Sequence, residues 1–421
     1  MLPLQSPLEA YRADLSRHPN RTDFGRSDTV WLLVAHCLHR LSRAQGDARR
    51  SIAENCASAI GDLSSTVTPD TSEEAAMIEQ LARMRRALPR IDSQNGAAEV
   101  VDSARTLADQ MGEAGALWLA FSTLGHARLA ATVAPHRDLG LAMADQAWVS
   151  RSLGDLDSAD ELYDAVAAVG EKYDQPELQA RALLGKGVAA RVRGNYPKAR
   201  KYFSDGLARA RRAGLHDLEA VGHQGLLIAA VTAGDHQTAL VHGWSAYELA
   251  ADSRDRQSEI LINLAHVSLQ AGHARAARCG FLSSMSRTEQ LRFKLPCIGG
   301  AAVASATLGD STMLAALART AEELVSATAL PFESASVLKS LFDAYRLAGD
   351  AARAEEYRLR ARALARKNGF FEIVLATDSA DAGASTSRPA TAPLSNQSMD
   401  VIHALESLEP EPVAGSLALT P

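Results

Sequence analysis

The stretch that decides the fold is GKGVAARVRGNYPKARKYFSDGL, residues 185–207. The segment from Gln179 to Arg193 lacks proline and predicts a first helix, and Gly194 with Asn195 predicts a turn. Pro197 falls in the first turn of a second helix, where its missing N–H costs no hydrogen bond. Apolar residues then recur at spacings of three and four, which predicts one buried stripe along that helix. The stretch therefore predicts a helical hairpin.

The turn glycine of this hairpin is one of seven that recur along the chain. Steps of 39, 40, 40, 38, 37 and 40 residues separate Gly115, Gly154, Gly194, Gly234, Gly272, Gly309 and Gly349. An alanine lies five residues after six of them: Ala120, Ala159, Ala199, Ala239, Ala277 and Ala354. Such a period predicts one hairpin copied and stacked, an all-α solenoid (an α-α superhelix) rather than a globule around one core. We expect the array over residues 96–375.

Helix packing explains why small and large side chains recur at fixed distances after each turn glycine. A small residue five places after the turn lets the second helix lie close to the first. Nine places after the turn a larger residue fills the gap between units: Leu124, Tyr163, Phe203 and Phe281. In the last unit Tyr357 is expected to take that place instead of Arg358. The unit around Gly309 departs most from the pattern, which suggests a distorted repeat.

Together these positions resemble the tetratricopeptide repeat (TPR) family. That family's motif has a small residue midway along the first helix, a turn glycine, an alanine and then an aromatic residue. Gly187, Gly194, Ala199 and Phe203 match it. The family's usual period is about 34 residues, and the longer period here is similar to that of bacterial regulators such as the sensor region of the maltose regulator and the Rap-type peptide receptors. The resemblance covers about residues 97–370 and implies an array that binds proteins or peptides.

Residues 1–95 contain helix-like stretches, including Thr29–Leu41 and Ala48–Ile60, but keep no clean period. A solenoid needs atypical ends to cover its exposed apolar face, so an N-terminal helical cap or degenerate repeats are expected there.

Residues 376–421 are rich in Ala, Ser, Thr, Pro and Asp, which predicts a disordered tail. Within it, Val401, Leu405 and Leu408 are spaced for a short helix near 399–408. Such a helix could dock into a partner's groove, could fold back onto the array, or could form without any role.

Composition excludes several classes of function. The net charge is -6 and charged residues make up 22% of the chain, so nucleic-acid binding by the whole surface is not expected. The four cysteines form no C-x-x-C pair, which indicates buried thiols rather than a disulfide framework. The N-terminus lacks the features of a signal peptide, and no apolar run reaches the roughly 20 residues of a membrane span. A cytoplasmic location, away from the membrane, is expected.

Motifs for catalysis or cofactor binding are absent from the sequence. There is no phosphate loop of the form G-x-x-x-x-G-K-[ST] and no H-E-x-x-H. His36 and His39 share a helix face, but no third ligand can be identified beside them. We therefore expect no enzyme activity, no catalytic residue, no cofactor and no metal. The basic run from Arg191 to Arg212 is either a docking patch for an acidic peptide, a phosphate or nucleic acid, or a solvated helix face.

Arginine also recurs three places before the turn glycine, at Arg151, Arg191 and Arg346. The resemblance implies that first helices line a concave groove, where these guanidinium groups could bind carboxylates of a peptide. Complementing the helix dipole is the alternative role. The candidate groove residues are Trp148, Arg151, Arg181, Val188, Arg191, Gln224, Ile228, His266, Lys339 and Arg346. The sequence thus predicts a non-enzymatic scaffold that binds a protein or peptide, possibly an acidic one, or alternatively a sensory regulator that responds to a peptide or small effector.

Overall fold

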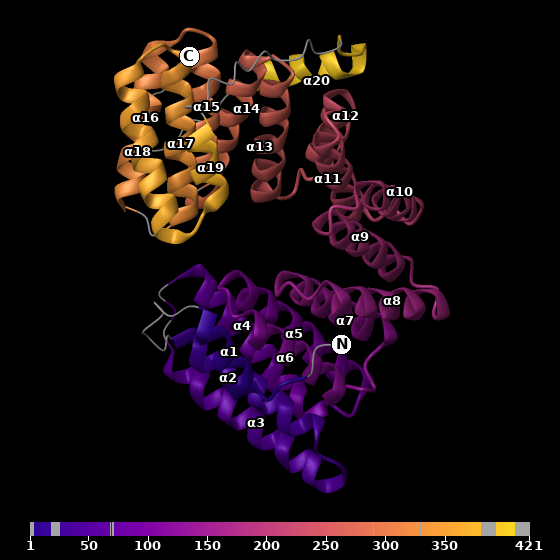
Figure 1. The fold of residues 1–421 in the computed structure, drawn as a ribbon. Helices are drawn as coiled ribbons and strands as arrows, with labels where there is room; N and C mark the ends of the chain where they lie inside the picture. The colour runs from indigo at the N-terminus through magenta and orange to yellow at the C-terminus, as the bar shows by residue number, and fades with distance from the viewer. Residues whose placement is uncertain are drawn as a thin grey trace. The chain divides into compact units, whose positions relative to one another are not determined.

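The fold was analysed in a computed structural model that describes residues 4–17, 26–67, 69, 71–288, 290–327, 330–379 and 393–408. Throughout these ranges the chain is helical, with 20 α-helices and no strand (Figure 1). It divides into two compact units, residues 1–218 and 219–421, which are described separately. The prediction of an all-α solenoid is confirmed, because the helices pack in consecutive pairs within each unit.

Unit 1 contains ten complete α-helices and one short 3-10 helix among its described residues. They are α1 (Pro7–Arg17), α2 (Arg26–Ser42), α3 (Gly46–Thr66), α4 (Ser72–Ala87), the short 3-10 helix η1 (Leu88–Arg90), α5 (Gln94–Glu113), α6 (Leu117–Ala130), α7 (His136–Ser152), α8 (Leu156–Lys172), α9 (Pro176–Val192) and α10 (Tyr196–Arg212). Each α-helix packs against the next one in sequence, and α7 also packs against both α5 and α9. The first helices of successive hairpins therefore lie side by side.

Unit 2 continues the same order of packing. It contains most of α11 (His216–Thr232), then α12 (His236–Leu249), α13 (Arg254–Gln270), α14 (Ala274–Arg287), α15 (Leu291–Thr307), α16 (Ser311–Ala327), α17 (Pro331–Leu347), α18 (Ala351–Asn368), α19 (Phe371–Ser379) and α20 (Asn396–Glu406). The first helices α13, α15 and α17 contact one another in turn. The hairpin around Gly309, predicted to be distorted, consists of two 17-residue helices, α15 and α16, and Pro296 lies inside α15.

The seven predicted turn glycines all adopt left-handed backbone. Their φ angles lie between +71° and +95°, the region that residues with a Cβ atom rarely occupy. At Gly194 the following N–H, that of Asn195, donates to the carbonyl of Ala190 at 2.9 Å and so closes the end of α9. Gly112 stays inside α5, so the first turn lies at Gly115. Pro176 and Pro331 occupy the first turns of α9 and α17, where each proline begins a new hairpin.

Replacing Gly194 by alanine should destabilise the array by about 1–2 kcal/mol, because a Cβ atom disfavours the left-handed backbone by about that amount. No atom lies within 4 Å of the added Cβ, so the backbone alone sets this effect. Gly194→Asn should lose less stability than Gly194→Ala, because asparagine tolerates the left-handed conformation. Urea unfolding of the three chains measures the difference, and equal midpoints for wild type and Gly194→Ala would show that the turn imposes no such requirement.

The large residues nine places after the turn are buried, as predicted. At most 3% of the surface is exposed at each of Tyr163, Phe203 and Phe281. In the last hairpin the buried residue is Tyr357 rather than Arg358. Three glycines on first helices make room for the rings of this set. A Cβ atom would lie 2.2 Å from Tyr163 at Gly185, 2.7 Å from Phe203 at Gly187 and 2.3 Å from Phe281 at Gly300. The close approach of helices therefore depends on glycine as well as alanine.

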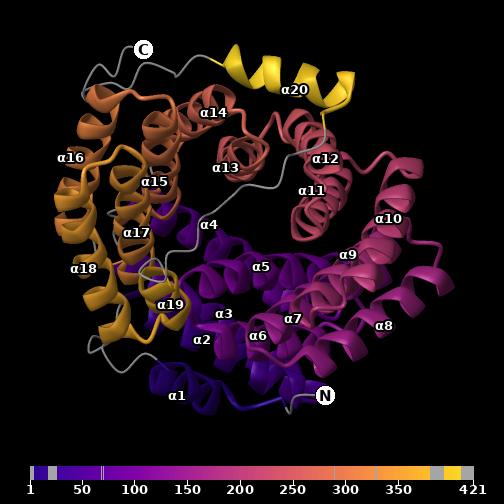
Figure 2. The same ribbon diagram turned by 45° about the horizontal axis from the view of Figure 1, so that its top comes forward.

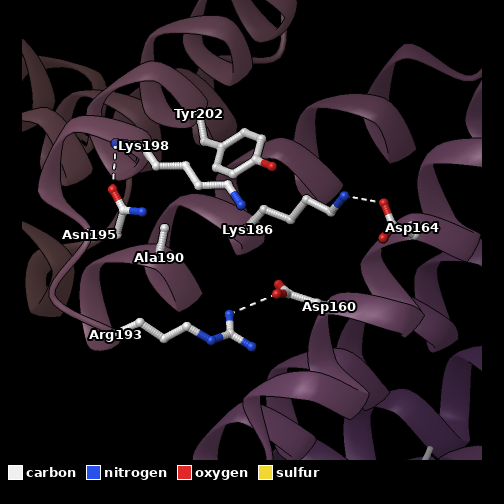
Figure 3. A pocket seen from close by; sticks show the side chains of 8 residues that line it. All are labelled: Asp160, Asp164, Lys186, Ala190, Arg193, Asn195, Lys198 and Tyr202. Atoms are coloured by element: carbon white, nitrogen blue, oxygen red, sulfur yellow. Dashed lines mark hydrogen bonds and ion pairs between the residues drawn. The ribbon is translucent and has the colours of Figure 1, made fainter.

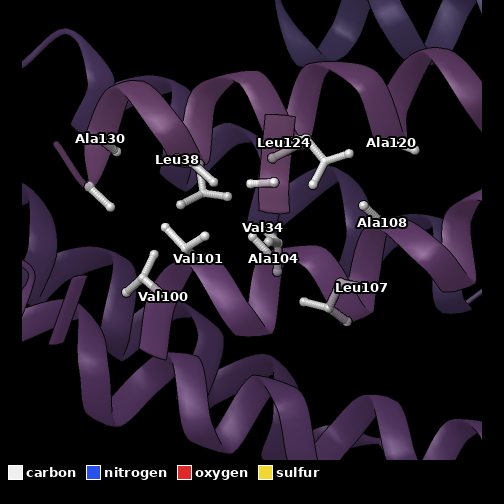
Figure 4. Packing of buried hydrophobic residues seen from close by; sticks show 14 of the residues in the cluster. Val34, Leu38, Val100, Val101, Ala104, Leu107, Ala108, Ala120, Leu124 and Ala130 are labelled. Atoms are coloured by element: carbon white, nitrogen blue, oxygen red, sulfur yellow. The ribbon is translucent and has the colours of Figure 1, made fainter. Parts of the chain in front are cut away.

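Helix α6 is the most enclosed element of unit 1, since α1, α2, α5 and α7 all pack against it. Figure 4 shows Leu38 of α2 and Val101 of α5 meeting Leu124 of α6 in this core. The buried carboxylate of Asp14, on α1, accepts the backbone N–H groups of Trp118 and Leu119, both at 2.9 Å. These are orphan donors in the first turn of α6, and a negative charge is favourable there. The N-terminal helices thus cap and cover the first hairpin.

Two histidines share a buried contact in this region. Nδ1 of His39 lies 3.1 Å from Nε2 of His126, which is 4% exposed and also lies 3.1 Å from the Gln5 carbonyl. Nδ1 of His39 therefore has a protein partner on α6. Burial lowers the pKa of His126 to about 4, against the opposing effect of the Gln5 carbonyl. The histidine consequently stays neutral at physiological pH.

Unit 1 should lose stability as the pH falls from about 6.5 towards 4. In this window the unfolded chain takes up a proton at His126 that the folded chain does not, so up to about 3 kcal/mol is lost. Urea unfolding at pH 7.5, 6 and 5 should show a shallower loss for His126→Gln than for wild type. Carboxylates titrate in both chains, so parallel curves would assign the acid sensitivity to them alone.

The predicted tail lies only partly within the described residues. Residues 376–379 complete α19, and 393–408 include α20, which forms where the short helix near 399–408 was expected. Val401 and Leu405 are buried, and α20 packs against α12 and α14. The helix thus folds back onto unit 2, one of the alternatives open from the sequence. The rest of the predicted disordered stretch lies outside the described residues.

Candidate functional site

Trp148 is the main partly exposed aromatic side chain on the first helices of unit 1. It lies on α7 and is 36% exposed. Its ring crosses to α5, where a Cβ atom on Gly112 would lie 2.9 Å from the indole. Gly112 therefore makes room for an aromatic ring at the surface, much as other glycines do for buried rings. A flat, half-exposed indole of this kind suits contact with an apolar group of a ligand.

Arg151 lies one helical turn after Trp148, close to the second helix of its own hairpin. It lies beside the buried ring of Tyr163 on α8, which in turn packs on Gly185 of α9. Burial raises the pKa of Tyr163, and the positive charge of Arg151 opposes that shift. The Nε atom of Arg151 is buried and has no hydrogen-bond partner among the described residues. This guanidinium group therefore interacts with the Tyr163 hydroxyl and retains a donor at Nε.

On α9, Val188 and Arg191 occupy the repeat positions equivalent to Trp148 and Arg151. Both are half-buried, and Arg191 has no ion-pair partner in the described part of the chain. Arg181, on the same side of α9, pairs with Glu177 at 3.3 Å. We call the surface formed by Trp148, Arg151, Arg181, Val188 and Arg191 on α7 and α9 the A-helix surface. It combines apolar and cationic groups.

Ion pairs tie the first helices of unit 1 together beside this surface. Arg105 on α5 pairs with Asp145 on α7 at 2.5 Å, and Arg137 on α7 pairs with Glu177 on α9 at 2.7 Å. Burial and the charge of Asp145 raise the pKa of Asp109 on α5, while Arg105 opposes the shift. The two ion pairs therefore link α5 to α7 and α7 to α9, the first helices of successive hairpins.

The other five candidate residues lie in unit 2, so the ten do not form one described site. Gln224 on α11 donates to Glu259 on α13 at 2.9 Å, and Ile228 lies one turn further along α11. His266 makes an edge-on contact with Phe281, with ring centres 4.8 Å apart. Lys339 and Arg346 both lie beside Asp343 of their own helix, at 2.7 and 3.9 Å. These two cations therefore have a carboxylate partner, whereas Arg151 and Arg191 form no ion pair among the described residues.

A small open pocket lies on the opposite side of α9 from the A-helix surface. Its volume is about 180 Å³, and its lining, drawn in Figure 3, is Asp160, Asp164, Lys186, Ala190, Arg193, Asn195, Lys198 and Tyr202. Lys186 pairs with Asp164, and Arg193 pairs with Asp160 at 2.7 Å. These eight residues include no serine, cysteine or histidine. Its ion pairs link α8 to α9 across the gap between hairpins.

The basic run from Arg191 to Arg212 has mixed surroundings. Arg193 is paired with Asp157 and Asp160, and Lys198 lies over the Tyr202 ring at 5.6 Å from its centre. Arg209, Arg211 and Arg212 occupy the last turn of α10, where positive charge complements the helix dipole. Much of the run therefore has a structural role.

Two other kinds of site, for a metal ion and for a membrane, are not found among the described residues. Among the described residues no group of three or more His, Cys, Asp or Glu side chains could hold a metal ion. No helix in the described ranges is long and apolar enough to cross a membrane.

Several of these features had only weak signals in the sequence. The pocket follows from the spacing of Lys186, Ala190 and Arg193, which places them on one face of α9. Gly112 blurs the position of the first turn in the sequence, whereas in the fold it makes room for Trp148. The packing of Tyr163 on Gly185 is a contact between two hairpins, and no local pattern encodes it.

Comparison with known proteins supports the fold. No protein-family model and no curated protein matches the chain. Among solved structures, it is similar to a Signal Transduction ATPase with Numerous Domains (STAND) protein with a tetratricopeptide repeat sensor from Pyrococcus horikoshii. The TM-score is 0.53 at 15% identity, over 79% of this chain and 55% of that one. This chain thus spans about half the length of that protein. The all-α hairpin array and this likeness show that the chain has a TPR-like fold.

A second solved structure is a Rap protein complexed with competence and sporulation factor. It has a TM-score of 0.49 and 12% identity, over 81% of this chain and 98% of that one. At this TM-score the likeness carries no functional argument.

Two glycines on the first helices should respond differently to alanine. Gly185→Ala places a Cβ atom 2.2 Å from the buried Tyr163 ring, and overpacking should destabilise unit 1 by about 1–2 kcal/mol after the gain in helix propensity. Gly112→Ala meets the outer edge of the half-exposed Trp148 ring, which can move, so its effect should stay below about 1 kcal/mol. Urea unfolding of both variants measures this. A larger loss at Gly112 would contradict the assignment of Tyr163 as the immobile ring.

Proposed function

We propose that the chain is a non-enzymatic scaffold that binds a protein or peptide segment on the A-helix surface of unit 1. The observation that carries the proposal is Arg151. Its Nε is buried without a hydrogen-bond partner in the described ranges, and it lies one turn from the exposed indole of Trp148. A buried donor that lacks a partner favours a ligand that supplies an acceptor.

The chemistry of the surface specifies the ligand class. Arg151 and Arg191 occupy equivalent positions on adjacent first helices and suit carboxylates spaced along an extended or helical segment. Trp148 and Val188 offer apolar contact one turn before each arginine. The ligand is therefore an acidic peptide segment with at least one apolar anchor.

A sensory role is the second candidate, because binding on this surface could change the packing between hairpins. The P. horikoshii protein carries a tetratricopeptide repeat sensor according to its name, and the shared fold makes this role reasonable. A change in radius of gyration when the selected peptide is added would favour sensing over a static scaffold.

Charge reversal at the two arginines should weaken peptide binding at least tenfold. Binders would be selected from a displayed peptide library against the full chain, and their Kd values measured for wild type and for Arg151→Glu/Arg191→Glu. The matched control is Arg200→Glu/Lys201→Glu, two exposed positions on α10. The control should bind like wild type. Equal losses in both double variants would indicate a non-specific charge effect, and no loss in either would remove the arginines from the site.

A further inference from the structure

Helix α20 packs against the other helices of unit 2 through its side chains. It lies across α12 and α14, the second helices of two successive hairpins (Figure 2). Val401, Ile402 and Leu405 are each at most 5% exposed and join a hydrophobic cluster with residues of α11, α12, α13 and α14. Buried Ser398 donates to the backbone carbonyl of Gln237 in the first turn of α12, at 3.3 Å. The contact therefore includes both apolar and polar recognition.

The helix has the features of a ligand that folds on binding. It is 11 residues long, and Ser395 caps it by accepting the backbone N–H of Ser398. Isolated helices of this length are marginal in water, so docking must supply much of its stability. Its outward face carries Asp400, His403 and Glu406, all exposed. The apolar and polar faces are thus cleanly separated, as in peptides that bind grooves as helices.

The covalent link to the rest of the unit is long. Residues 380–392, with the sequence ADAGASTSRPATA, separate α19 from the segment that contains α20 and include no large apolar residue. A tether of this kind gives a weakly binding segment an effective concentration of about a millimolar at its site. A segment held in this way can dock in the same molecule and still yield to a tighter ligand.

We propose that the apolar face of α12 and α14 that contacts α20 is a binding site for a short amphipathic helix of a partner protein, and that α20 occupies it as an internal competitor. The partner helix would carry apolar residues at i, i+1 and i+4, as Val401, Ile402 and Leu405 do. It would also have a small hydroxyl residue one turn earlier, equivalent to Ser398. This site is separate from the A-helix surface and is made of other helices, so it goes beyond the proposed function.

A peptide of residues 393–408 with a fluorescent label provides the probe. Its binding to the full chain would be measured by anisotropy for wild type, for Ile402→Asp/Leu405→Asp and for the control His403→Asp. The double variant should release its own α20 and bind the peptide at least tenfold more tightly than wild type. His403→Asp introduces an acid on the exposed face of the same helix and should behave like wild type. Equal affinity for all three chains, or no binding to the double variant, would overturn the proposal.

A second measurement uses the wild-type chain alone. At a large excess of unlabelled peptide, hydrogen exchange at the α20 amides should speed up, while the amides of α12 and α14 stay protected. Unchanged α20 protection at saturating peptide would show that the helix is a fixed part of unit 2. A dimer that forms in wild type and is lost in Ile402→Asp/Leu405→Asp would show that α20 docks on a second copy of the chain. That result would overturn the proposal that α20 occupies the site within its own molecule.

Discussion

The close approach of neighbouring helices is the constraint on which this protein depends. Each of the seven hairpins turns through a glycine with φ of at least +71°, and the residue five places later is a buried alanine in six of them. The turn sends the chain back at once, and the small residue lets the second helix settle against the first. Large side chains nine places after the turn then fill the space between hairpins. Where a ring needs more room, a glycine on a first helix provides it, as Gly185 does for Tyr163.

These packing positions leave other positions free to carry chemistry. Residues three and six places before the turn glycine are not needed to bring the helices together, and they differ between hairpins. In unit 1 they include Trp148, Arg151, Val188 and Arg191, and in unit 2 His266 and Arg346. Ion pairs within a helix engage Lys339 and Arg346, whereas Arg151 interacts with the Tyr163 hydroxyl. The same fold can thus present an available cation in one hairpin and a neutralised one in another.

Segments outside the repeat cover parts of the array in both units. In unit 1, Asp14 satisfies the first N–H groups of α6, and Arg49 donates to the carbonyl of Leu41 at the end of α2 and to that of Ala130 at the end of α6. In unit 2, α20 covers apolar residues of α12 and α14. These contacts join residues far apart in the chain. They cover surfaces that the repeat itself would leave exposed.

The sequence by itself determined the hairpins, because a turn glycine, a small residue and an aromatic residue act on neighbours within one repeat. It therefore predicted the seven left-handed turns, the burial of Tyr163, Phe203, Phe281 and Tyr357, and a helix near 399–408. Only the tertiary structure decided which glycine receives which ring, that His39 faces His126, that five candidate groove residues belong to each unit, and where α20 docks. Those outcomes depend on contacts between separate hairpins, whose partners are selected by shape and burial and leave no periodic trace in the chain.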